Sequence, residues 1–235
     1  MRVLLLSAYD ARSHQAWHQV LQQGLPDWDW TLLTLPPRHF AWRVRGNPLS
    51  WSSSSRDVLE ADYDLLLATS MVDLATLRGL VPRLAALPTA LYFHENQFAY
   101  PEGDSQHGQL EAQMVSLYSA LAADSLLFNS RWNMNSFVDG VSRLLARLPD
   151  AVPDGVPEQL AARSRVLPVP VDSGSAAVAE RGSAAALQLV WNHRWEFDKG
   201  PELLLEIASA IADRGVEIHV VGQQFRQQPA AFAKL

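Results

Sequence analysis

The chain alternates short apolar runs with longer segments in which apolar residues recur at helical spacing. The short runs have the length and composition of strands buried in a parallel sheet. We expect strands over residues 3–6, 29–35, 64–70, 89–93 and 125–128. Helices are expected over about 14–23, 56–60, 109–122 and 131–148, with another that begins at Asp73. This alternation predicts an α/β domain built on a doubly wound parallel sheet.

A second strand–helix–strand pattern begins at residue 187. A strand is expected over 187–190, a helix from Pro201 and a strand from Val216. Residues 173–183 are rich in Ser, Ala and Gly, which is typical of a linker. We therefore expect an N-terminal domain over 1–172 and the start of a second Rossmann-like domain over 184–235.

The roughly 50 residues after the linker are fewer than the order of 100 that an independent doubly wound domain needs. We expect this second domain to be incomplete in this chain. Its apolar residues, such as Leu204, Ile218 and Val220, would then need cover from the first domain or from a second copy. Self-association is therefore one alternative.

Composition limits the functional classes. Hydrophobic residues make up 48% of the 235 positions, which is ample for a buried core. A net charge of -6 argues against a protein that binds nucleic acid with its whole surface, while a local basic patch remains allowed. The absence of cysteine excludes disulfides and thiolate zinc sites. No signal peptide or apolar run of ~20 residues is evident, so we expect a soluble cytoplasmic protein that does not bind membranes.

A polar loop over residues 191–201 separates the strand at 187–190 from the helix that follows. Loops that leave the carboxyl ends of such strands bind ligands, and a helix amino terminus favours negative charge. Arg194 and Lys199 add two positive charges, and Gly200 lets the backbone approach a ligand. Pro201 suits the first helical turn. The loop predicts a diphosphate site, and the alternative is a surface loop whose cations are merely solvated.

Residues 38–51 combine three arginines and a histidine with Phe and two Trp, without a periodic core pattern. We interpret the segment as a loop. Cations suit phosphates and planar groups stack on unpaired bases, a combination typical of single-stranded RNA recognition. Alternatively, the aromatic rings tuck under the domain and the arginines pair with acidic residues. The candidates for RNA contact are Arg38, Trp42, Arg43 and Arg45.

Further polar residues follow three strands at the edge where ligands bind. His94, Glu95 and Asn96 follow the fourth strand directly. A zinc-protease motif is excluded because no second histidine comes four residues later, so a core histidine is the main alternative to a ligand contact. Ser13 and His14 end the first strand–helix loop, where Ser13 could instead serve as the helix N-cap. Asn129 and Ser130 are expected to cap the helix after the fifth strand.

Several of these motifs resemble known glycosyltransferases. Arg194 followed by Lys199-Gly200-Pro201-Glu202 resembles the donor-binding loop of retaining GT-B enzymes. The residues at 191–196 (Trp-Asn-His-Arg-Trp-Glu) and at 92–97 (Tyr-Phe-His-Glu-Asn-Gln), with Tyr-Pro at 100–101, are similar to the tRNA-queuosine mannosyltransferases. Ser13-His14 and Phe-Asn-Ser at 128–130 match as well, although the two glycines that precede Ser-His in that family are absent. Residues 166–172 resemble the last strand of the family's first domain.

The resemblance implies a GT-B fold and transfer of mannose from GDP-mannose to queuosine in a tRNA anticodon, with retention of configuration. It implies Arg194 and Lys199 as the cations that stabilise the leaving diphosphate and His94 as a contact to the sugar, without a metal or cofactor. The implied donor-binding residues are Asn192, Glu196, Gly200 and Gly222. The implied acceptor-binding residues are Ser13, His14, Arg38, Trp42, Arg43, Arg45, Glu95, Asn96, Asn129 and Ser130.

Two other functions remain open at this stage. One is a transferase of the same fold with another nucleotide sugar and a small glycoside or lipid as acceptor. The absence of a basic amphipathic helix counts against a lipid. The other is a non-catalytic RNA-binding module, because the second domain is expected to be incomplete.

Overall fold

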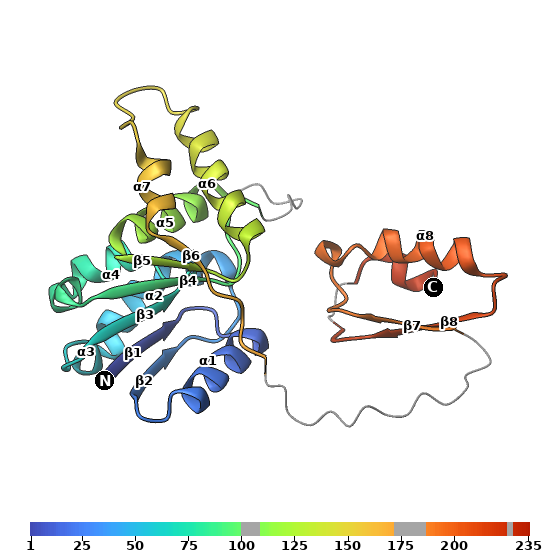
Figure 1. Ribbon diagram of the computed structural model, residues 1–235, viewed down its shortest axis with the longest axis horizontal. Helices are drawn as coiled ribbons and strands as arrows, with labels where there is room; N and C mark the ends of the chain where they lie inside the picture. Colours follow the sequence, from blue (N-terminus) through green and yellow to red (C-terminus); the bar gives the residue numbers. More distant parts are fainter. Residues whose placement is uncertain (100–108, 172–186, 225–227) are drawn as a thin grey trace. The chain divides into compact units, whose positions relative to one another are not determined.

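The computed structural model describes residues 1–99, 109–171, 187–224 and 228–235 (Figure 1). The chain divides into two compact units, Met1–Asp172 and Ser173–Leu235, which we describe separately. The predicted linker over 173–183 and the Tyr-Pro pair at 100–101 lie outside the described residues.

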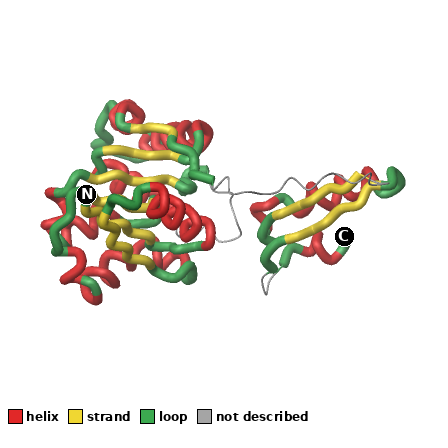
Figure 2. Tube along the Cα trace, turned by 60° about the horizontal axis from the view of Figure 1, so that its bottom comes forward, coloured by secondary structure: helices red, strands yellow, loops and turns green. Residues whose placement is uncertain are grey.

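The first unit is built on a parallel sheet of six strands in the order β2-β1-β3-β4-β5-β6. The predicted doubly wound α/β architecture is confirmed, and Figure 2 shows helices on both sides of the strands. The strands are β1 (Arg2–Ser7), β2 (Asp29–Thr34), β3 (Leu65–Thr69), β4 (Thr89–Phe93), β5 (Ser125–Phe128) and β6 (Ser164–Val166).

Alternate residues of β1 divide the core of this unit into two clusters. Leu4 and Leu6 pack with residues from the helices on one face, whereas Val3 and Leu5 pack with Trp17 on the other. The helices are α1 (Arg12–Gly24), α2 (Phe40–Ser54), α3 (Arg56–Leu59), α4 (Leu74–Leu80), α5 (Gln109–Ala122), α6 (Arg131–Leu145) and α7 (Val156–Ala162), with the 3₁₀ turn η1 (Pro82–Ala86). The helix α1 supplies Trp17 and therefore covers the second face.

The segment predicted as a loop over 38–51 is instead mostly the helix α2. A proline inside a helix normally leaves the carbonyl four residues earlier without a donor. Here the side-chain amide of Asn47 donates to that carbonyl, on Val44, at 3.0 Å and to the carbonyl of Arg43 at 2.7 Å. Asn47 thereby replaces the hydrogen bond that Pro48 cannot make. Gly46 leaves room for the indole of Trp42, which a side chain at Gly46 would overlap.

Several other boundaries differ from the sequence-based expectation. The helix α6 ends at Leu145 rather than at 148, and the helix α7 follows it with Gly155, at a φ of 78°, as N-cap and Pro157 in the first turn. The last strand, β6, covers 164–166 rather than 166–172. The serines at 52–54 end α2, and Ser55, the N-cap of α3, makes no side-chain capping bond.

The second unit is a parallel pair of strands, β7 (Leu187–Asn192) and β8 (Val216–Val221), joined through the helix α8 (Pro201–Ile211). The 3₁₀ turns η2 (Phe197–Lys199) and η3 (Ala230–Ala233) complete its described part. Leu204 was expected to be exposed, but it is buried on α8, which packs against η3. Ile218 and Val220 are half-buried, because they lie on the face of the strands opposite to the exposed residues of β8.

Phe137 of α6 offers a test of the first core. It is fully buried, with ring centroids 4.8 Å from Phe93 and 5.5 Å from Phe128. Phe137→Ala should lower the free energy of unfolding by about 3–5 kcal/mol, because it removes a buried ring and leaves a cavity. Urea unfolding measures the change. Tyr118→Ala is the control, since this ring is 53% exposed on α5 and its loss should cost no more than about 0.5 kcal/mol.

Candidate functional site

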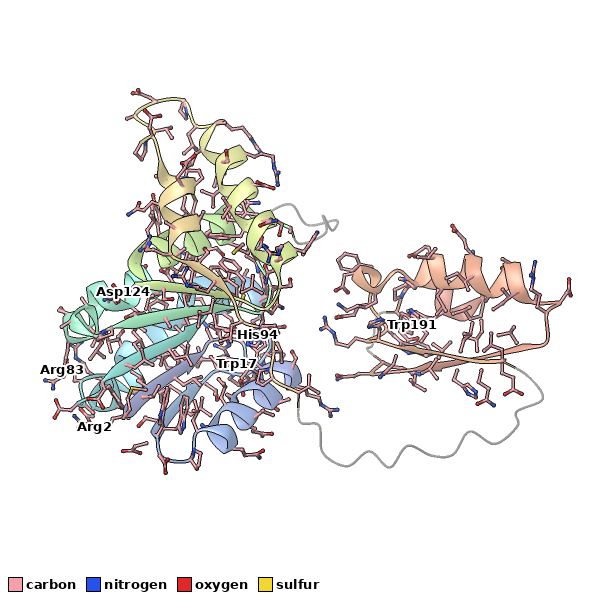
Figure 3. All side chains as sticks on the ribbon, viewed as in Figure 1. Arg2, Trp17, Arg83, His94, Asp124 and Trp191 are labelled. Carbon is pink, nitrogen blue, oxygen red and sulfur yellow. The ribbon has the colours of Figure 1, made fainter. Side chains whose placement is uncertain are left out.

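The predicted site residues of the first unit lie at one edge of the sheet. All six strands run parallel, so the loops after β1, β4 and β5 leave the same edge. The connections of the sheet reverse direction between β1 and β3, where open α/β sheets bind ligands. In Figure 3, His94 and Trp17 lie side by side at this edge, at the opposite end of the sheet from Arg2, Arg83 and Asp124.

His14 and His94, predicted from separate motifs, are brought together by the fold. Their rings stack with centroids 4.0 Å apart and planes 18° apart. Trp17 and Tyr92 each present an edge-on contact to His94 at 4.8 Å. His94 therefore sits in a pocket of rings rather than in open solvent.

This pocket controls the charge of His94. Burial, and to a smaller extent the neighbouring imidazoles of His14 and His18, together lower the pKa of His94 to about 2. His94 is therefore neutral at physiological pH, and its buried Nε2 has no hydrogen-bond partner within the described residues. Burial likewise raises the pKa of Tyr92 to about 12, and its hydroxyl donates to the carbonyl of Leu167 at 2.9 Å.

Carboxylates accompany two of the three imidazoles. Nε2 of His14 lies 3.7 Å from Glu95, a predicted acceptor contact whose side chain is partly exposed. Nε2 of His18 lies 3.4 Å from Asp10, and both side chains are nearly buried. No motif in the sequence pointed to Asp10 or His18. The four-residue spacing of His14 and His18, which puts both on one helix face beside Trp17, is the signal that could have found the second histidine.

Ser13 occupies the first turn of α1 rather than its N-cap. The helix begins at Arg12, and Ala11 is the N-cap without a side-chain capping bond. The structural alternative for Ser13 is therefore wrong. Its side chain is exposed at the edge that carries His14. Contact between Ser13 and an acceptor stays a prediction.

Three asparagines fasten the loop after β4 to the first turn of α6. The amide of Asn96 donates to the side-chain oxygen of Asn133 at 2.7 Å, and the amide of Asn133 donates to the side chain of Asn129 at 2.9 Å. Asn129 in turn donates to the carbonyl of His94 at 2.5 Å. Ser130 caps α6 by accepting from the backbone of Asn133, as predicted. Asn96 and Asn129 thus position His94, and their assigned contacts with an acceptor remain untested.

The four predicted RNA contacts lie on α2 or just before it. Some of them are occupied by other residues of the protein and some are free. Arg45 pairs with Asp73 at 2.5 Å and with Glu111 at 3.1 Å, so it ties α2 to α5. Arg43 donates to the carbonyl of Pro36 at 3.1 Å. Arg38 and Trp42 are exposed, and Arg38 forms no ion pair with the described residues. Arg38 and Trp42 are therefore the members of this set that are free to meet a ligand.

In the second unit, both predicted phosphate-binding cations have acidic partners. Arg194 lies 2.9 Å from Glu196, and Nζ of Lys199 lies 2.8 Å from the nearly buried carboxylate of Asp198. Arg194 also approaches Asp198 at 3.9 Å. Glu196, predicted to bind the donor, therefore pairs with Arg194, and the loop carries no net charge from these four side chains.

Two glycines allow the backbone path of the 191–201 loop. Gly200 has a φ of 68° and forms the N-cap of α8, and Pro201 follows in the first turn as predicted. Gly222 has a φ of 146°, and a side chain there would overlap the carbonyl of His193. Gly222 thus allows the loop to cross the end of β8. Asn192, the last residue of β7, is exposed beside it.

The aromatic residues of the loop have a packing role. Trp195 stacks on Phe232 with ring centroids 4.4 Å apart, and Trp191 meets the same ring at 5.3 Å. The backbone N–H of Trp195 donates to the carbonyl of Gln223 at 2.9 Å. These contacts hold Arg194 against the end of β8.

Two features are absent from the described parts of the chain. No three His, Asp or Glu side chains are arranged to hold a metal ion there. No helix there is long and apolar enough to cross a membrane. The expected independence from metal stays a prediction.

The fold belongs to the GT-B class of glycosyltransferases. The solved structure described as "Trehalose-6-phosphate from E. coli bound with UDP-2-fluoro glucose" matches 99% of this chain and 67% of its own, with a TM-score of 0.55 and 11% identity. Spinosyn rhamnosyltransferase SpnG complexed with thymidine diphosphate matches 94% of this chain and 65% of its own, with a TM-score of 0.43 and 14% identity.

Sequence comparison identifies the family. The family described as "tRNA-queuosine alpha-mannosyltransferase N-terminal" matches residues 2–171. A curated tRNA-queuosine alpha-mannosyltransferase from Drosophila melanogaster is 32% identical over an alignment of 243 positions, which covers 98% of this chain. The chain belongs to the tRNA-queuosine alpha-mannosyltransferase family. It spans 63% of the length of the Drosophila protein.

The depressed pKa of His94 predicts how stability depends on pH. The folded state binds the proton only near pH 2, whereas the unfolded chain binds it near its ordinary pKa of 6.5. The unfolded state therefore holds more protons between these values, and stability must fall as the pH falls below the unfolded pKa. From about pH 7.5 to about pH 5.5, His94 should remove about 1.4 kcal/mol of stability.

Urea midpoints at the two pH values test this prediction. His94→Asn should lose about 1.4 kcal/mol less than the wild type on the same acidification, because His14 and His18 remain in both proteins. Equal losses in the two proteins would show that the unfavourable protonation of His94 is not the cause.

Proposed function

We propose that this chain takes part in the transfer of mannose from GDP-mannose to a hydroxyl of queuosine in a tRNA anticodon, with retention at the anomeric carbon. The observation that carries the proposal is the match of the tRNA-queuosine mannosyltransferase family to residues 2–171, the unit in which His14, His94 and Glu95 lie together. In this function the first unit would bind the acceptor, and the 191–201 loop would bind the diphosphate of the donor.

The chemistry proposed for the second unit is stabilisation of the leaving group. The bond between the anomeric carbon and the diphosphate oxygen breaks as the bond to the acceptor oxygen forms on the same face. A phosphate oxygen of the departing GDP takes the hydroxyl proton. The diphosphate gains negative charge during this step, so Arg194 and Lys199 would stabilise the transition state more than the ground state.

The charge states of the site suit the proposed roles. A neutral His94 puts no positive charge beside the sugar, and its buried Nε2, which has no partner within the described residues, would accept from or donate to a sugar hydroxyl after a shift of the surrounding rings. Arg194 and Lys199 are held by Glu196 and Asp198, and a diphosphate would replace these carboxylates as the partner of the cations. The proposed reaction requires no further cofactor.

A non-catalytic RNA-binding module is the second candidate. It is favoured by the exposure of Arg38 and Trp42 in the first unit, while Arg194 and Lys199 of the second unit are occupied by carboxylates. Separate measurements of GDP-mannose binding and tRNA binding distinguish the candidates. If the chain is a non-catalytic RNA-binding module, it should bind tRNA and should not bind GDP-mannose.

Mass spectrometry of queuosine-containing tRNA tests the transfer itself. Incubation with the chain and GDP-mannose should add one hexose to the modified nucleoside. Arg194→Ala and Lys199→Ala should each lower the rate about 100-fold or more, as expected for lost transition-state charge stabilisation. The controls Arg214→Ala and Lys234→Ala remove exposed cations of the same unit and should leave the rate unchanged. A wild-type rate in the first two variants would remove the diphosphate-binding role.

A further inference from the structure

The first turn of α6 exposes a tryptophan beside an arginine. All eight tryptophans lie in the described parts of the chain, and Trp42 and Trp132 alone are exposed, at 50% and 68%. Trp132 makes no ring contact with the described residues. Arg131 is also exposed, and its guanidinium forms no ion pair or hydrogen bond within the described residues. Neither side chain has a packing role that would explain its presence at this position.

The sheet topology puts this pair on the same edge as the predicted RNA contacts. The helix α6 follows β5, and Arg38 and Trp42 follow β2 at the other end of the strand order. Four strand spacings separate β2 from β5, about 19 Å in all. His94, at the end of β4, lies between the two. An exposed tryptophan and an unpaired arginine thus occur on each side of the histidine.

This combination suits single-stranded nucleic acid. The face of an indole stacks on an unpaired base, and a guanidinium binds the adjacent phosphate. Arg45, Arg56 and Arg83 of the same unit are occupied by carboxylates, whereas Arg38 and Arg131 are not, in the part of the chain that the structure describes. Unpaired cations at this edge can therefore meet phosphates without first losing an ion pair.

We propose that Arg131 and Trp132 form a second contact for single-stranded RNA, on the opposite side of His94 from Arg38 and Trp42. The proposal rests on the proposed function, in which the acceptor is a nucleoside in a tRNA loop. It adds that nucleotides on both sides of the modified nucleoside contact the protein, with one base stacked on Trp132 and one phosphate bound by Arg131.

Binding of a fluorescently labelled RNA hairpin with queuosine in its loop tests this contact on the 235-residue chain. Trp132→Ala should weaken binding about 10-fold, within the range for loss of one stacked base, and Trp132→Phe should restore most of it. Arg131→Ala should lower the slope of log K against log salt by about 0.7, the value for one phosphate of a single strand. Trp132→Ala should leave that slope unchanged, because no charge is lost.

Matched controls lie at the far end of the same layer. Arg147 follows α6 about 20 Å from its first turn, at 1.5 Å per residue, and Arg147→Ala should change neither affinity nor slope. Tyr118→Ala removes a ring that is 53% exposed on α5 and should likewise have no effect. A blunt RNA duplex of the same stem should bind without any dependence on Trp132. Circular dichroism melting confirms that each variant is folded.

The outcomes separate this inference from the proposed function. If the hairpin binds and neither Arg131→Ala nor Trp132→Ala weakens it relative to the controls, the second contact is wrong while an acceptor role for the unit stands. If the wild-type chain binds no hairpin, both are wrong. If Trp132→Ala instead alters the sedimentation of the chain and leaves RNA binding intact, the exposed ring is an interface between copies and the inference is overturned.

Discussion

The candidate site depends on the buried amide of Asn133. This side chain donates to the carbonyl of Phe93 at 3.0 Å and to Asn129, and it accepts from Asn96. One residue thereby joins the end of β4, the end of β5 and the loop that follows β4. A buried amide left without these partners would cost about 1–3 kcal/mol, so the three segments hold one another in a single arrangement. The stack of His94 on His14 requires that arrangement.

The strands and most of the helices could be predicted because they follow hydrophobic periodicity. The expected bounds of β4, α5 and β5 match the structure residue for residue. The helix α2 was wrongly predicted as a loop because Gly46 and Pro48 are normally unfavourable in the interior of a helix. The helix persists because Asn47 supplies the missing donor and Trp42 packs over the glycine. These compensations are tertiary and local side-chain contacts that no propensity scale contains.

The sequence was sufficient to predict which residues belong to the site, but not which contacts they make. Motifs pointed to His14 and His94 separately, and parallel strand topology brings their loops to one edge. Their ring stacking, and the burial that keeps His94 neutral, depend on Trp17 and Tyr92, whose contacts with His94 no pattern in the sequence indicates. The occupation of Arg45 by Asp73 and Glu111 could not be foreseen either, since its partners come from segments 28 and 66 residues away.

The two kinds of cation suit two kinds of anion. Arg194 and Lys199 are neutralised within their own loop, and the carboxylate of Asp198 that holds Lys199 is nearly buried. A bound anion must compete with these carboxylates, which a compact diphosphate with several charged oxygens can do where a single phosphodiester cannot. Arg38 and Arg131 face no such competitor within the described residues. In the proposed function, an acidic chain can therefore bind RNA through a few unpaired arginines at one sheet edge. The paired cations Arg194 and Lys199 would bind the diphosphate of the sugar nucleotide.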